Sequence, residues 1–178
     1  MTEDDFWEII EGCRGASGGV FAEQVRLQRA RLLRLSMDEL VSFGHWWEAV
    51  DDRAFTWPVW DVAALLLQGC SDDSFSDFRA WLIGQGREVF ERISDEPDRL
   101  ADVADAWSDA VCGHAETFGL QVLAVYEERT GSYDMPERAP AGPSGLTGES
   151  VNIEDERIAR AHFPRMAAIQ YGPDLRQA

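Results

Sequence analysis

The sequence predicts an all-α protein, a single-domain bundle of about six to eight helices with a Pro/Gly-rich loop before the C-terminal helix. Apolar residues recur at helical spacing through most of the first 130 residues. Several of these stretches follow a Ser or Thr and begin with acidic residues, as helix starts do. No run alternates strictly between apolar and polar residues, as a half-buried strand would.

The first two expected helices flank a glycine-rich break at residues 15–19. One runs from Glu3 to about Gly12, with Thr2 as its cap, and the other runs from Phe21 to Leu35. The second carries four arginines and is the one basic stretch of an acidic chain. It pairs either with the protein's own carboxylates or with a partner.

Two further helices complete the first half of the chain. Ser36 and Glu39 have the spacing of a capping box, and the helix that they start is expected to end near Asp52. Pro58 suits the first turn of the next helix. Residues 59–67 are apolar nearly all round, which predicts a buried central helix.

Glycines and breaks in the apolar pattern separate the later helices. A helix capped by Ser71 is followed by a kink or break near Gly86, after which the apolar pattern resumes through Ile93. A firm helix is expected from Ala115 to Arg129, and an acidic one from about Ile153 to His162.

The domain organisation follows from a change in composition after residue 130. We expect a helical core domain at residues 1–130 and a Gly/Pro/Ser-rich loop at 131–150. Residues 151–178 are expected to form a C-terminal helix and tail that pack on the core.

Charge and composition exclude several classes of function. The net charge of −17 argues against nucleic-acid binding and against anionic membranes, and it favours a cationic protein partner. The chain has no lysine, so a Schiff-base lysine or P-loop lysine is excluded. The three cysteines are far apart and the acidic N-terminus has no long apolar run, which predicts a protein of the reducing cytoplasm.

Arg79 is a charge where a core residue is expected. On a helix that turns about 100° per residue, Arg79 lies within about 40° of Phe75 and Ile83, in the middle of the apolar arc. A buried arginine must be paired, because an unpaired buried charge costs several kcal/mol.

Two interpretations of Arg79 remain open, beside a surface position at the helix kink. In the first, Arg79 closes a structural ion pair with Asp72, Asp61 or a carboxylate from another helix. In the second, it lines a pocket with nearby tryptophans and binds a small anionic or planar ligand.

Other chemistry-bearing residues form no complete set. His45 and Glu48 have a spacing compatible with metal ligation, but no second such pair appears, so the sequence predicts no metal site and no cofactor. Cys70 lies at a helix start, where it is either a reactive thiol or a small buried side chain.

Four segments resemble, in order, a bacterial family called domain of unknown function 4240, which is common in actinobacteria. They are FWEIIE, WPVWDVAALLLQGCSDDSFSDFRAWLIGQGREVFE, YEERTG and IEDERIARAHFPRM, and the resemblance covers most of the chain. It implies a small stand-alone domain, also found fused to other modules, and no established chemistry. It implies a signature of Trp57, Trp60, Gly69, Cys70, Ser71, Asp72, Asp73, Phe78, Arg79 and Gly86. The family tends to have an Asp between the two tryptophans, where this chain has Pro58 and Val59.

Two functions therefore compete. The first is a protein-interaction or regulatory module without catalysis of its own. The second is a small-molecule binding protein or enzyme, with a biosynthetic pathway as one setting. The candidate ligand-binding residues for the second are Trp57, Trp60, Asp72, Asp73, Arg79 and Trp81.

Overall fold

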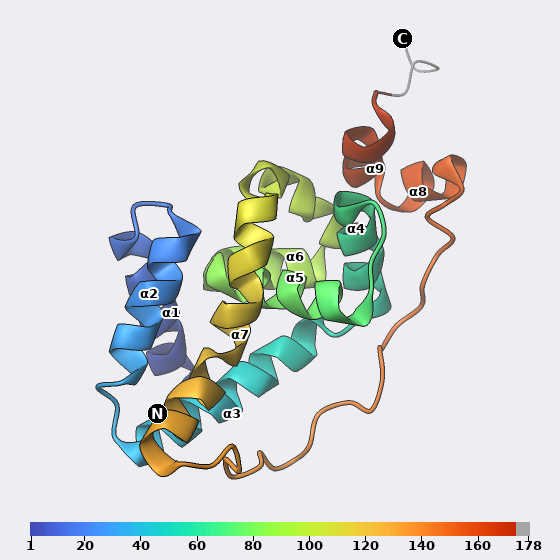
Figure 1. Cartoon of the computed structure of the whole chain (residues 1–178). Helices are drawn as coiled ribbons and strands as arrows, with labels where there is room; N and C mark the ends of the chain where they lie inside the picture. Colours follow the sequence, from blue (N-terminus) through green and yellow to red (C-terminus); the bar gives the residue numbers. More distant parts are fainter. Residues whose placement is uncertain (174–178) are drawn as a thin grey trace.

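The computed structural model describes residues 1–173, apart from the side chain of Asp109, and within that range it is helical with no β-strand (Figure 1). The α-helices are α1 (Glu3–Ala16), α2 (Phe21–Leu32), α3 (Met37–Ala54), α4 (Trp57–Leu67), α5 (Asp72–Gly84), α6 (Arg87–Asp95), α7 (Asp109–Thr130), α8 (Glu156–His162) and α9 (Pro164–Tyr171). Two short 3-10 helices, η1 (Pro97–Asp102) and η2 (Ala104–Ala106), join α6 to α7. The predicted all-α class is confirmed.

The local helix signals explain where most helices begin. Thr2, Ser36 and Ser71 each cap a helix through a capping box, and Pro58 lies in the first turn of α4. The break between α5 and α6 falls at Gly86, whose φ of 89° is a conformation that favours glycine.

Some helix bounds differ from those expected. Helix α7 begins at Asp109 rather than Ala115, because the Ser108 side chain accepts a hydrogen bond from the Val111 N–H. Helix α8 begins only at Glu156, where Asp155 provides the cap. Residues 174–178 of the predicted tail lie outside the described residues.

Helix α5 lies at the centre of the bundle. It packs against α1, α3, α4, α6 and α7, and α7 crosses in front of it in Figure 1. The hydrophobic core includes four large side chains of α5: Phe75, Phe78, Trp81 and Leu82. The other residues of α5 lie beside this buried face, where the neighbouring helices pack.

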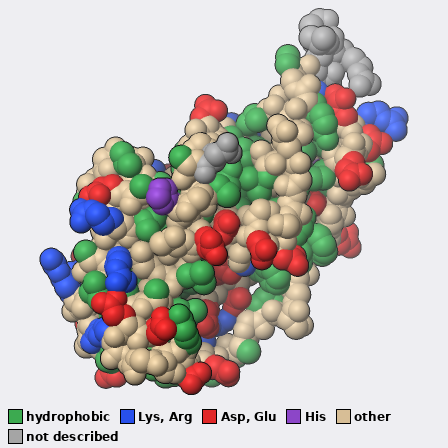
Figure 2. Space-filling model, viewed as in Figure 1, with side chains coloured by type: hydrophobic (Ala, Val, Ile, Leu, Met, Phe, Trp, Pro, Cys, Tyr) green, Lys and Arg blue, Asp and Glu red, His purple; other side chains and the backbone are tan. Residues whose placement is uncertain are grey.

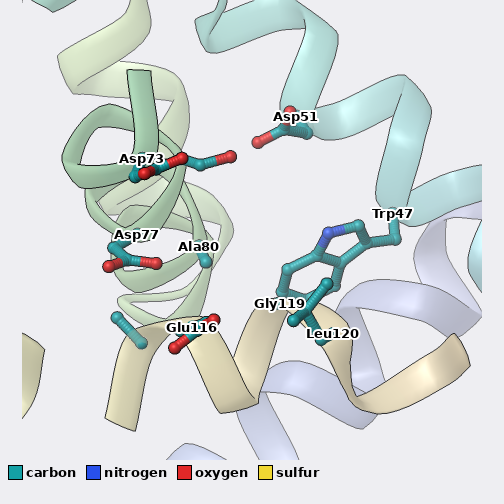
Figure 3. Close-up of a pocket in the computed structure, with 10 residues that line it drawn as sticks. Trp47, Asp51, Asp73, Asp77, Ala80, Glu116, Gly119 and Leu120 are labelled. Carbon is teal, nitrogen blue, oxygen red and sulfur yellow. The ribbon is translucent and has the colours of Figure 1, made fainter. Parts of the chain in front are cut away.

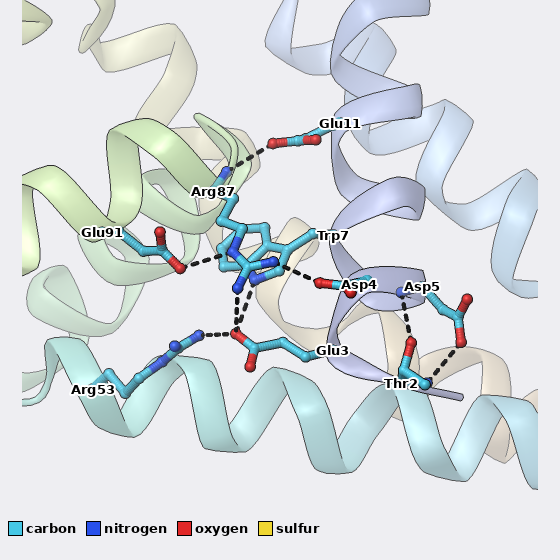
Figure 4. Close-up of polar contacts among 9 residues, drawn as sticks. All are labelled: Thr2, Glu3, Asp4, Asp5, Trp7, Glu11, Arg53, Arg87 and Glu91. Carbon is cyan, nitrogen blue, oxygen red and sulfur yellow. Dashed lines mark hydrogen bonds and ion pairs between the residues drawn. The ribbon is translucent and has the colours of Figure 1, made fainter.

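A polar network joins α1 to α6 and α3 on one side of the bundle (Figure 4). Arg87 Nε donates to Glu91 Oε1 at 2.8 Å, and Arg87 Nη1 donates to Asp4 Oδ1 at 2.7 Å. Arg53 Nη2 donates to Glu3 Oε1 at 2.8 Å. Acidic residues of the first helical turn are thereby matched with arginines from elsewhere in the chain.

Residues 131–155 form a long loop that runs beside α3 and α4 to reach α8 (Figure 1). His45 Nε2 donates to the Pro136 carbonyl at 2.7 Å, and Arg138 forms an ion pair with Asp52. Burial raises the pKa of Asp52, and Arg138 opposes that shift. The loop is therefore held to the core by side chains of α3.

Asp61 of α4 anchors the far end of this loop. Its carboxylate is buried, with 2% of the residue exposed. It accepts hydrogen bonds from Ser150 Oγ at 2.8 Å and from the Val151 N–H at 2.9 Å. Helix α9 then packs on α4 and η1, where Asp98 accepts from the Met166 N–H at 2.9 Å.

None of the helices in the described part of the chain combines the length and the apolar character that crossing a membrane requires.

Asp61→Asn should lower the free energy of unfolding by about 1–3 kcal/mol. The substitution replaces one acceptor oxygen with an NH₂ group, whose N–H donors would face the Ser150 hydroxyl or the Val151 N–H. Urea denaturation measures this loss, and limited proteolysis should cut residues 136–150 faster than in the wild type. Asp105→Asn, at an exposed position, is the matched control. Equal stability and equal cleavage rates would show that Asp61 does not anchor the loop.

Candidate functional site

Arg79 of α5 points inward and binds Asp51 of α3. Arg79 Nε donates to Asp51 Oδ1 and Arg79 Nη2 donates to Asp51 Oδ2, both at 2.9 Å. The two parallel bonds form the bidentate geometry in which arginine–carboxylate pairs are strongest. The inward direction predicted from the helical spacing is confirmed, and the partner is a carboxylate from another helix.

Aromatic rings complete the surroundings of the Arg79 guanidinium. Its central carbon lies 4.7 Å from the ring centre of Phe55 and 4.6 Å from that of Phe75. Each ring adds a cation–π attraction. The guanidinium thus has its charge neutralised by Asp51 and its faces covered by Phe55 and Phe75.

Asp51 also lines a pocket of about 470 Å³ between α3, α5 and α7 (Figure 3). The lining residues are Trp47 and Asp51 from α3, Asp73, Ser76, Asp77 and Ala80 from α5, and Ala115, Glu116, Gly119 and Leu120 from α7. At Gly119 the two helices approach closely, because a Cβ there would lie 3.2 Å from the Ala80 Cβ. We call this cavity the acidic pocket.

The acidic pocket concentrates negative charge. Four of its lining residues are carboxylates: Asp51, Asp73, Asp77 and Glu116. Asp51 is paired with Arg79, whereas the other three have no basic partner within the described part of the chain. Burial, and next the nearby charges of Glu116 and Asp73, raise the pKa of Asp77. A positive charge in the pocket would relieve this repulsion.

Trp47 forms one wall of the acidic pocket. It is 9% exposed and packs edge-on against Phe118, with the ring centres 5.5 Å apart. Figure 3 shows the indole nitrogen on the edge nearest Asp51. No hydrogen bond of this N–H is found among residues 1–173. The wall therefore presents an aromatic ring and a free donor.

These features suit the recognition of a cation. Carboxylates attract a positive group, and an indole ring adds cation–π attraction once that group is desolvated. No three His, Cys, Asp or Glu side chains of the described residues are grouped so as to hold a metal ion.

The structure distributes the six residues proposed from the sequence among different places. Asp73 lines the acidic pocket, and Arg79 contacts it through Asp51. Asp72 is exposed in the first turn of α5. Trp57 is half-buried, and its backbone N–H donates to the Thr147 carbonyl at 2.8 Å.

The other two tryptophans line separate cavities. Trp60 packs on Phe75, with ring centres 4.8 Å apart, and faces a cavity under residues 150–154. Trp81 packs edge-on against Trp107 and borders a cavity beside Gly18 and Gly19. The structure therefore does not bring the three tryptophans together around Arg79.

Four pocket residues were not predicted as site residues from the sequence: Trp47, Asp51, Asp77 and Glu116. Two spacings carried a signal, because Trp47 and Asp51, like Asp73 and Asp77, are four residues apart and share a helix face. Glu116 offered no such signal, since its contribution depends on how α7 crosses α5.

The surroundings of His45 and Cys70 favour structural roles for both side chains. His45 contacts the loop at Pro136, as described above. Burial raises the pKa of the Cys70 thiol, which favours the protonated and less nucleophilic form.

Comparison with known proteins gives one match. Residues 1–128 match a family model described as a protein of unknown function, DUF4240. No curated protein and no solved structure matches the chain. The matched range contains every lining residue of the acidic pocket.

Asp51→Ala should cost about 2–4 kcal/mol of unfolding free energy, because it leaves the Arg79 guanidinium buried without a counter-charge. Arg79→Met should cost less, because methionine keeps the packing between the rings. The exposed fractions of the two side chains, 9% for Arg79 and 24% for Asp51, let water solvate the stranded aspartate better. Urea denaturation of both variants measures the difference. Losses of equal size would contradict this account.

Proposed function

The chain belongs to the DUF4240 family of proteins of unknown function, and we propose that it is a cytoplasmic protein-interaction module without catalysis of its own. In this proposal the acidic pocket receives an arginine or lysine side chain from a basic segment of a partner protein. The observation that carries the proposal is the group of three carboxylates, Asp73, Asp77 and Glu116, that face one cavity without a basic partner among the described residues.

The surface around the pocket supports a protein partner. Acidic side chains gather on the face over α5 and α7 (Figure 2). The chain as a whole has a net charge of −17, which accelerates the approach of a cationic protein and repels an acidic one. The pocket then provides a defined place for one side chain within a broad attractive field.

The lining of the pocket favours binding over catalysis. Its ten described lining residues include no histidine and no cysteine, and Ser76 is the only hydroxyl among them. A hydroxyl nucleophile needs an adjacent base and a group that orients that base. Carboxylates around an aromatic wall form instead a receptor for a positive group.

A small organic cation is the second candidate, and Trp47 favours it. The indole N–H of Trp47 is a donor, so an amine that also carries an oxygen acceptor would satisfy both the carboxylates and Trp47. An anionic ligand at Arg79 has less support, because Nε and Nη2 already donate to Asp51 and the rings of Phe55 and Phe75 cover the guanidinium faces.

The indole N–H signal of Trp47 in ¹H–¹⁵N spectra tests the proposal directly. Titration with a blocked arginine-containing pentapeptide should shift this signal, and Asp77→Asn with Glu116→Gln should weaken binding at least about tenfold by removing two charges. Asp38→Asn with Glu149→Gln removes the same charge from exposed positions outside the pocket lining and should change affinity little.

Three results would oppose the protein-partner proposal. An unshifted Trp47 signal at millimolar peptide, or equal losses in the two double variants, would contradict cation binding in the pocket. A signal that responds to spermidine or an amino alcohol but to no arginine or lysine peptide would replace the protein partner with a small organic cation.

Asp77→Asn should raise the free energy of unfolding at pH 7. The pKa of Asp77 is raised in the folded state, so its ionised form is disfavoured by folding. That cost is fully present above the folded-state pKa and is absent below the unfolded-state pKa near about 4. The advantage of the variant should therefore shrink as the pH falls toward 3, as urea denaturation across this range would show. An advantage that grows on acidification would contradict the assignment.

A further inference from the structure

A second groove lies between α1 and α2, at the end of the molecule away from α8 and α9 (Figure 1). Its volume is about 380 Å³. Ile9 and Cys13 of α1 are buried at its base, and Leu27 and Ala30 of α2 are half-buried in its wall. This α1/α2 groove is thus lined largely by apolar side chains.

Two arginines at this groove have no ion pair within the described part of the chain. The basic stretch 21–35 carries four arginines, of which Arg26 pairs with Glu23 and Arg29 pairs with Glu128. Arg31 and Arg34 are exposed and line the groove. Basic side chains also gather at this end of the molecule in Figure 2.

The charge at the groove is opposite to that of the chain as a whole. Glu8 is the one carboxylate among the described lining residues, against Arg31 and Arg34. In a protein of net charge −17, two arginines that form no ion pair with any described residue, and that lie beside apolar surface, give local attraction for an acidic partner. The aliphatic parts of the two arginine side chains suit apolar contact. Their guanidinium groups suit carboxylates at the rim of such a contact.

We propose that the α1/α2 groove docks an acidic amphipathic helix of a partner protein. Neighbouring helices that leave an apolar groove accept such a helix through residues spaced at i, i+3, i+4 and i+7. The apolar face of the partner helix would lie on Ile9, Cys13 and Leu27, and its carboxylates would reach Arg31 and Arg34. Because this groove is separate from the acidic pocket, the protein would join an acidic partner to a basic one.

Gly12 provides a way to close the groove without disturbing the fold. It lines the groove in α1, and a Cβ added there would meet no atom within 4 Å. Gly12→Phe therefore places a ring in the groove, and glycine is in any case a poor helix former. Gly113→Phe is the matched control, because Gly113 lies in α7 with equally open space and does not line the groove.

A displayed library of 16-residue amphipathic helices, with random residues beside a fixed apolar stripe, tests the proposal on the full chain. Selected helices should be enriched in Asp and Glu beside the stripe. Gly12→Phe should weaken their binding at least about tenfold, and Arg31→Gln with Arg34→Gln should weaken it about fivefold or more. Gly113→Phe should leave affinity unchanged, and added salt should weaken binding to the wild type.

Several outcomes would overturn the proposal. Selection of no helix, of basic helices, or of helices that bind Gly12→Phe as well as the wild type would each rule out an acidic helix in this groove. Sedimentation that shows self-association of the wild type, lost in Gly12→Phe, would assign the groove to a second copy of the chain. Asp77→Asn with Glu116→Gln should not affect library binding, so this test fails or succeeds independently of the acidic pocket.

Discussion

The buried ion pair between Arg79 and Asp51 is the constraint on which the rest of the site depends. A guanidinium in the core requires a carboxylate at hydrogen-bond distance, so the C-terminal half of α3 must lie against α5. This contact brings Trp47, one turn earlier on α3, to the wall of the acidic pocket. The next residue, Asp52, then faces the loop and meets Arg138. One pair thereby sets both the pocket and the path of residues 131–155.

The distribution of paired and unpaired charges separates structural carboxylates from candidate binding ones. Glu3, Asp4 and Glu91 are matched by arginines where α1, α3 and α6 meet (Figure 4). Asp77 and Glu116 have no such match among the described residues. Burial, and next the negative charges of Glu116 and Asp73, raise the pKa of Asp77, so its ionised form reduces stability. Their placement supports the proposal that the pocket receives an external cation.

The sequence predicted the local features and missed the contacts between distant segments. The caps at Ser36 and Ser71 and the inward direction of Arg79 depend on neighbours within a few residues, so spacing alone revealed them. Asp51 was not identified as the partner, because the pairing of α3 with α5 depends on how two helices pack. The same reason hid Glu116, which α7 brings to the pocket from almost forty positions beyond Asp77.

Both proposed binding surfaces are built from the part of the chain that matches the family. The acidic pocket uses α3, α5 and α7 up to Leu120, and the α1/α2 groove uses residues before Leu35, all within residues 1–128. The loop and α8–α9 lie beyond that range and contact mainly α3, α4 and η1. Because they contribute no lining side chain to either surface, the C-terminal segment acts on the proposed sites only through the stability of α3 and α4. Opposite charge on two separate faces of one helical bundle supports the proposal that the protein holds two unlike partners together.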